Sequence, residues 1–342
     1  MSFFKKISSA LSKYDSRQVL RVAVKNYLGS YEALERAAYS FEDLSGIVDQ
    51  LSEKEFEALR KEIPSLMMVD RSRLASFVIG GGLTAKQFES VRSRAEVRSQ
   101  LLYSAGFCRN TQKPPNYAKG VELLRAALKV RPKPRMYALR EVQPDVEDLS
   151  VIVTDRIVTV ESRHLPMFVS ENQVESTANE VVSFRDVEFF GMVYMGLAKA
   201  LTYSSMELEE ANQACDVAIY YLEKTRHFDL NILLRGICWF DKGMSNYYMG
   251  RVKEALDCYT QAYPFYESVA SKIPSQGMKL GVADCLLYKG ECELLMGMRK
   301  EAKVDLELAL NLSVEIGQRD NQARAFTFLR QLETIKDDRS IS

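Results

Sequence analysis

One pattern of spacing, repeated between Trp239 and Ala309, limits what this chain can fold into. Trp239, Gly243, Gly250, Ala255 and Ala262 are separated by gaps of 4, 7, 5 and 7 residues. The same gaps recur in a second set: Leu286, Gly290, Gly297, Ala302 and Ala309. Small residues at helical spacing let two helices cross closely, and a glycine can take the positive φ that ends a helix. Each set therefore predicts two antiparallel helices joined at a glycine.

The pattern resembles the tetratricopeptide repeat family, in which an aromatic residue or Leu precedes a Gly and the second helix carries Ala and then an aromatic residue. The matching residues are Trp239, Gly243, Ala255 and Tyr259 in the first unit and Leu286, Gly290, Ala302 and Leu306 in the second. Four residues depart from the family pattern: Lys242, Asn246, Lys289 and Glu293. The period from Ala255 to Ala302 is 47 residues, whereas the ordinary repeat has about 34. Generic Gly and Ala contacts in a helical bundle are the alternative explanation.

The resemblance implies a curved solenoid of helical hairpins, in which the first helix of each hairpin lines a concave groove that binds an extended peptide or a partner helix. Carried over by spacing, the groove residues are Asp241, Met244, Tyr248, Asp284, Tyr288 and Glu291. From the residues alone, the three carboxylates are interpreted as ordinary solvated helix charges rather than as acid–base catalysts. The many tyrosines are interpreted as packing residues of the repeats.

Helical periodicity extends beyond the two clear units. Residues 184–203 and 208–223 predict a degenerate hairpin, and residues 319–335 predict a final capping helix. Residues 95–108 followed by 117–132 predict a divergent repeat. Ser52 and Glu55 form a capping-box pattern that predicts a helix through Leu59. The expected organisation has six parts: 1–14 amphipathic helix, 15–94 helical region, 95–132 divergent repeat, 133–182 insertion, 183–316 repeats, and 317–342 capping helix and tail.

The first 14 residues predict a cationic amphipathic helix. Phe3, Phe4, Ile7 and Leu11 fall on one face, and no acidic residue precedes Asp15. Such a helix can lie in an anionic membrane surface. Docking of the same face on the protein body is the alternative.

Charge is distributed unevenly although the formal net charge is zero. Residues 109–140 carry an excess of eight positive charges, and residues 141–188 an excess of eight negative charges. The basic stretch either faces the acidic one, is simply solvated, or binds an acidic protein, phosphate or lipid headgroup. Nucleic acid is a weaker candidate, because only Tyr117 and Tyr137 could stack on bases. The basic-patch candidates are Lys119, Arg125, Lys129, Arg131, Lys133 and Arg135.

Residues 133–182 interrupt the helical pattern. The β-branched run at 149–160 resembles a small β-hairpin. A long connection with its own structure often carries function, and a linker tucked against one repeat is the alternative. The expected fold is therefore all-α: a helical-hairpin solenoid with an N-terminal helical region and a small β-hairpin insertion.

The sequence points to binding rather than catalysis. It holds only two histidines, and its six cysteines form no Cys-x-x-Cys pair, so we expect no metal site, no cofactor and buried reduced thiols. We expect a non-enzymatic adaptor, scaffold or regulator that binds a protein or peptide in the cytoplasm. The alternatives are a peptide-sensing switch that uses a hinge at Gly80–Gly82, a scaffold recruited to a membrane surface, and an enzyme as the least favoured class.

Overall fold

The computed structural model describes residues 15–29, 31–67, 93–131, 184–205, 207–223 and 229–337. Within these ranges the secondary structure is helical and contains no strand. The N-terminal part consists of α2 (Ser16–Tyr27), α3 (Tyr31–Ile47), the 3-10 turn η1 (Val48–Gln50) and α4 (Glu53–Arg60). The predicted all-α class is confirmed for the described residues, whereas the hairpin expected at 149–160, the membrane helix and the glycine hinge lie outside them.

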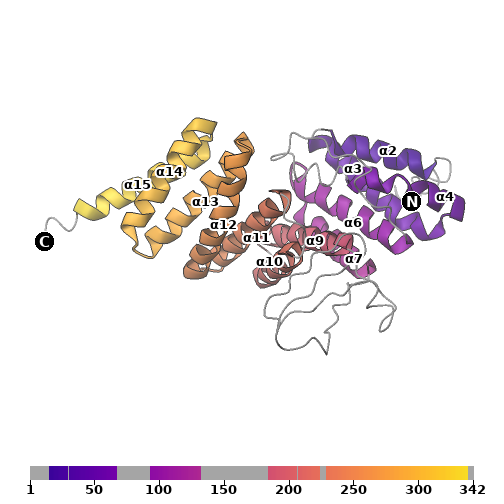
Figure 1. Cartoon of the computed structure of the whole chain (residues 1–342), viewed down its shortest axis with the longest axis horizontal. Coiled ribbons are helices and arrows are strands. Elements are labelled where there is room, and N and C mark those ends of the chain that lie inside the picture. Colours follow the sequence, from indigo (N-terminus) through magenta and orange to yellow (C-terminus); the bar gives the residue numbers. More distant parts are fainter. Residues whose placement is uncertain are drawn as a thin grey trace, which may run out of the picture.

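Four helical hairpins and a last helix follow one another along the long axis of the molecule (Figure 1). The first helix of each hairpin is α6 (Arg94–Thr111), α9 (Phe184–Tyr203), α11 (Asp229–Tyr248) and α13 (Gln276–Leu295). Their second helices are α7 (Tyr117–Val130), α10 (Leu208–Glu223), α12 (Val252–Lys272) and α14 (Arg299–Ile316), and α15 (Arg319–Asp337) ends the array. The predicted hairpin at 184–203 and 208–223 coincides with α9 and α10.

Local sequence signals explain where several helices begin. Ser52 and Glu55 form the predicted capping box at α4, and Ser93 and Glu96 form another at α6. In each box the serine side chain accepts from the backbone N–H three residues on, which satisfies one of the free donors at a helix start. The Asn116 side chain does the same for α7.

Glycines determine how the two clear hairpins turn and pack. Gly250 and Gly297 have φ of 74° and 78°, the left-handed conformation that ends α11 and α13. Gly243 and Gly290 permit the close approach of the two helices in each hairpin. A Cβ at these positions would lie 2.6 Å from the Tyr259 ring and 2.8 Å from the Leu306 side chain, respectively. Both roles agree with the sequence prediction.

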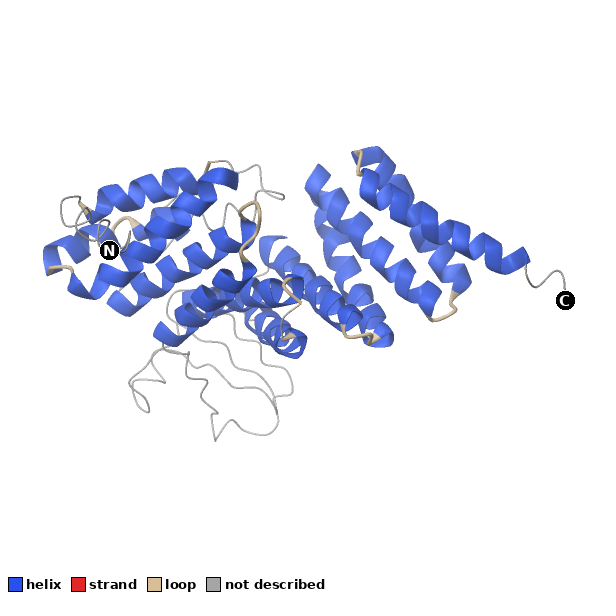
Figure 2. Cartoon of the chain, turned by 180° about the vertical axis from the view of Figure 1, so that it is seen from behind, coloured by secondary structure: helices blue, strands red, loops and turns tan. Residues whose placement is uncertain are grey.

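The helices pack in a regular order that defines two sides of the array. Each second helix packs against the next first helix, so α7 contacts α9, α10 contacts α11, α12 contacts α13 and α14 contacts α15. First helices also contact one another directly at α6–α9 and α9–α11, and α15, which occupies the next first-helix position of the array, contacts α13. We call the side on which α9, α11, α13 and α15 lie together the first-helix face. Figure 2 shows the same succession of helices from behind.

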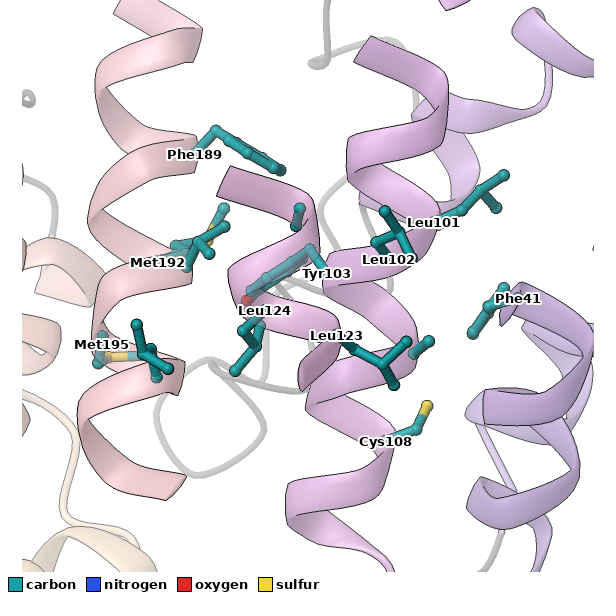
Figure 3. Packing of buried hydrophobic residues seen from close by; sticks show 14 of the residues in the cluster. Phe41, Leu101, Leu102, Tyr103, Cys108, Leu123, Leu124, Phe189, Met192 and Met195 are labelled. Atoms are coloured by element: carbon teal, nitrogen blue, oxygen red, sulfur yellow. The ribbon is translucent and has the colours of Figure 1, made fainter. Parts of the chain in front are cut away.

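Two hydrophobic cores meet at α11. The first runs from α2 to α11 and buries side chains of α3, α6, α7 and α9 (Figure 3). The second runs from α11 to α15. Helix α11 contributes Leu234 and Cys238 to the first core, and Leu233, Phe240 and Met244 to the second. All six cysteines are free thiols and buried, as the sequence predicted.

Candidate functional site

The first-helix face carries a group of tyrosines and carboxylates from four helices. Asp241 and Tyr248 lie on α11, Asp284 and Tyr288 on α13, Tyr203 at the end of α9, and Arg324 on α15. Burial, and then the nearby Asp241, Tyr288, Tyr248 and Asp284, raise the pKa of the Tyr203 hydroxyl. These side chains therefore lie close enough to interact electrostatically although their helices are distant in sequence.

Asp241 is the most unusual member of this group. It is 2% exposed, and its Oδ2 has no hydrogen-bond partner. Within the described chain, no Lys, Arg or His nitrogen comes within 4.0 Å of its carboxylate. Burial raises its pKa to about 6, and Lys199 and the Tyr203 hydroxyl oppose that shift. A buried carboxylate without a counter-charge is costly to maintain, so its presence requires an explanation.

Asp284 lies on the next first helix, also within electrostatic reach of Tyr203, and its carboxylate is only partly satisfied. The Asn321 side chain of α15 donates to Oδ1 of Asp284 at 2.5 Å. Among the described residues no other donor reaches this carboxylate. Burial raises the pKa of Asp284, and Asn321 and Arg324 oppose that shift.

Glu291, in contrast, is fully engaged. Its Oε1 accepts from the Tyr247 hydroxyl at 2.6 Å, and its Oε2 accepts from Arg324 at 3.0 Å. The Arg324 guanidinium also lies over the Tyr288 ring, 4.5 Å from its centroid. Glu291 and Arg324 neutralise each other, which leaves Asp241 and Asp284 as the uncompensated charges of this face.

The six predicted groove residues thus divide into two kinds. Tyr248 is 46% exposed, and Asp284 and Tyr288 are half-buried, so these three can contact another molecule. Asp241, Met244 and Glu291 are buried. Met244 belongs to the second core, where its sulfur lies 3.2 Å from the Tyr259 hydroxyl. The interpretation of Asp241 and Glu291 as solvated helix charges is wrong, because the packing of the helices buries both side chains.

Sequence reasoning missed Tyr203, Asn321 and Arg324 as members of this face. Tyr203 ends the first helix of the degenerate hairpin, where the glycine pattern is absent, so the spacing rule did not reach it. Asn321 and Arg324 lie in residues 319–335, for which the sequence predicts only a capping helix. The packing of α15 against α13 turns them toward Asp284 and Glu291.

The basic stretch is mostly paired within the chain. Lys119 bonds to Glu122, and Arg125 forms ion pairs with Glu207 and Glu210 of the following hairpin. Arg131 is buried, lies 3.9 Å from Glu96 and stacks on the Phe189 ring. The acidic region 141–188 lies mostly outside the described residues, so its position relative to the basic stretch stays a prediction. Lys129 is exposed, whereas Lys133 and Arg135 lie outside the described residues.

Comparisons with known proteins add little to these observations. No family model matches the chain, and no curated protein matches it. Among solved structures, it is similar to the apo form of RapI, with 10% sequence identity and a TM-score of 0.45. That alignment covers 94% of this chain and 73% of the RapI chain. At this TM-score the similarity supports no inference about function.

Separately, none of the described helices is long and apolar enough to span a membrane.

Proposed function

We propose that this protein is a non-enzymatic adaptor or regulator that binds a peptide segment of another protein on its first-helix face, in the manner of tetratricopeptide repeats. The observation that carries the proposal is the convergence of side chains from α9, α11 and α13 on one face, where the buried Asp241 Oδ2 has no hydrogen-bond partner. A surface built from successive parallel helices suits an extended chain, because it offers similar contacts at each repeat.

The exposed tyrosines support the same proposal. Tyr203 and Tyr248 are 37% and 46% exposed, so each offers part of a rigid aromatic ring to another molecule. Such side chains combine apolar contact with hydrogen bonding and lose little rotamer entropy when they are covered. Tyr117 extends the row, since its ring stacks on Tyr203 with centroids 6.2 Å apart.

Cross-linking from the two sides of the array tests this proposal. A photo-crosslinking phenylalanine derivative replaces Tyr248 on the first-helix face or, as a matched control, Leu308 on the second helix α14. Leu308 is exposed to a similar degree as Tyr248. After irradiation in cells, we expect position 248 to capture a discrete peptide segment of a partner, and position 308 to give only background. Equal capture at both positions would contradict the proposal.

A further inference from the structure

The fold alone does not indicate which chemical group a ligand carries. The two uncompensated carboxylates on the first-helix face do. Asp241 Oδ2 is buried with no protein donor, and Asp284 receives only the Asn321 amide. Both carboxylates lie near Tyr203. A neutral or anionic ligand group would leave Asp241 without a counter-charge, whereas a cation would supply one.

The cations already present do not fill this role. Arg324 is committed to Glu291 and to the face of Tyr288. Lys242 and Lys289, which also lie on first helices, are paired with Asp216 and Asp305. Lys199 of α9 is exposed, and its nitrogen lies beyond ion-pair distance of Asp241. The face therefore keeps an excess of negative charge at Asp241 and Asp284.

The other groups facing Asp241 cannot balance its charge either. They are the Tyr203 hydroxyl of α9, the Cys215 thiol of α10, the Cys238 thiol of α11, the Tyr117 hydroxyl of α7 and the Tyr266 hydroxyl of α12. All five are acids that are neutral at physiological pH, and burial raises the pKa of each. They can at most donate a hydrogen bond.

Aromatic rings near the carboxylates favour the same class of ligand. Tyr203 interacts electrostatically with Asp241, Asp284, Tyr248 and Tyr288, so the three rings lie on the same face as the two carboxylates. Guanidinium and ammonium groups are attracted to the faces of aromatic rings, and guanidinium also pairs well with carboxylates. Arg324 on Tyr288 is an example of that contact within the protein itself.

Building on the proposed function, we infer that the bound peptide presents a cationic group, the guanidinium of an arginine or the ammonium of a lysine or of its own N-terminus, to Asp241 and Asp284 on the first-helix face. The cation gives Asp241 Oδ2 a charged partner. The exposed Tyr203 and Tyr248 then cover the aliphatic part of the same group.

Selection from a random peptide library tests the inference without knowledge of the natural partner. Heptapeptides displayed on phage with free N-termini are selected in parallel against the full-length wild-type protein, D241N and Tyr248→Ala. The melting curves of the three proteins show that each is folded. Selected peptides are then synthesised in three forms: unchanged, Nα-acetylated, and with arginine replaced by citrulline or lysine by Nε-acetyl-lysine.

We expect wild-type protein to enrich peptides that carry a cation at a constant position. Neutralising that cation, or introducing D241N, should weaken binding at least tenfold. If only Nα-acetylation abolishes binding, the cation is the peptide N-terminus. If neutralisation of the side chain abolishes binding, the cation belongs to arginine or lysine.

Two other outcomes are possible: one contradicts only the cationic ligand, and the other also contradicts the proposed binding face. If selected peptides lose binding to Tyr248→Ala but tolerate both D241N and neutralisation, the cationic ligand is wrong and the proposed peptide-binding face stands. If no selected peptide is affected by Tyr248→Ala or D241N, both the cationic ligand and the binding face are wrong.

Discussion

The Tyr247 hydroxyl on α11 donates a hydrogen bond of 2.6 Å to Glu291 on α13, and Arg324 on α15 donates to the other oxygen of the same carboxylate. One carboxylate thus joins three successive first helices. The Tyr247 ring also contacts the Tyr288 ring, with centroids 6.3 Å apart. These side chains fill the space between α11 and α13, where the second core begins.

Tyr247→Phe should lower the free energy of unfolding by about 2 kcal/mol, because it removes a hydrogen bond to a charged group that is buried. Urea denaturation followed by circular dichroism measures the change. Tyr263→Phe is the matched control, since the Tyr263 hydroxyl bonds to Glu267 on the same helix at an exposed position. The control should change stability by less than about 0.5 kcal/mol. Equal losses of stability in the two variants would show that the Tyr247–Glu291 bond between α11 and α13 contributes no more than an exposed hydrogen bond.

Gly243→Ala should destabilise the protein by about 1–3 kcal/mol, because the new methyl group overlaps the Tyr259 ring. A Cβ there would lie 2.6 Å from Tyr259 Cε1. Gly46→Ala tests the opposite case, since Gly46 lies in helix α3 with nothing within 4 Å of a Cβ. Thermal denaturation should show that Gly46→Ala raises stability by about 0.5–1 kcal/mol, as alanine is the better helix former. A neutral Gly243→Ala would contradict the close packing of α11 on α12.

Glu42→Gln should lower stability by about 3 kcal/mol, because it removes the nearest counter-charge of a buried guanidinium and leaves only Glu35, at 3.9 Å. Arg109 of α6 is 3% exposed and bonds to Glu42 of α3 at 2.7 Å, so the pair ties the N-terminal helices to the first hairpin. The control is Glu57→Gln, which removes the exposed pair between Glu57 and Arg60. It should cost no more than about 0.5 kcal/mol. Chemical denaturation of both variants at pH 7 measures the difference.

Asp241→Asn should stabilise the free protein at neutral pH. The pKa of Asp241 is raised from 3.8 to about 6 by burial, so the folded state binds the proton more tightly than the unfolded state. Stability is then highest below pH 4, falls as the pH rises through 6, and is about 3 kcal/mol lower at pH 7 from this group alone. Melting temperatures measured from pH 4 to 8 should show that the gain of Asp241→Asn grows between pH 4 and 6 and is nearly constant above that.

Asp257→Asn controls for charge removal at an exposed position of α12. It should change the melting temperature little at any pH in that range. A wild-type protein whose stability relative to Asp241→Asn does not change between pH 4 and 7 would show that Asp241 ionises normally.

The hairpins could be predicted from the sequence because their signals are local and steric. Gly250 and Gly297 adopt positive φ, and Gly243 and Gly290 admit a neighbouring helix, wherever the hairpins lie in the molecule. Capping by Ser52 likewise depends only on residues within one helical turn. Such features need no knowledge of distant contacts.

The surroundings of the charged residues could not be predicted in this way. Asp241 has a helical neighbourhood typical of a solvated charge, and it is the packing of other helices against α11 that buries it. Arg125 finds Glu207 and Glu210 more than 80 residues later in the chain. Charge pairing across a solenoid depends on which helices become neighbours, and spacing within a single unit does not contain that information.

The titration of Asp241 in the free and peptide-bound protein tests the central claim most directly. Carboxyl 13C NMR, with the resonance assigned by its absence in D241N, follows this one group as the pH is changed. The account predicts a pKa of about 6 in the free protein, which a saturating cationic peptide lowers to about 4–5 because the charged form gains a partner. A pKa that stays the same when the peptide is bound would contradict the claim that Asp241 receives the ligand's cation.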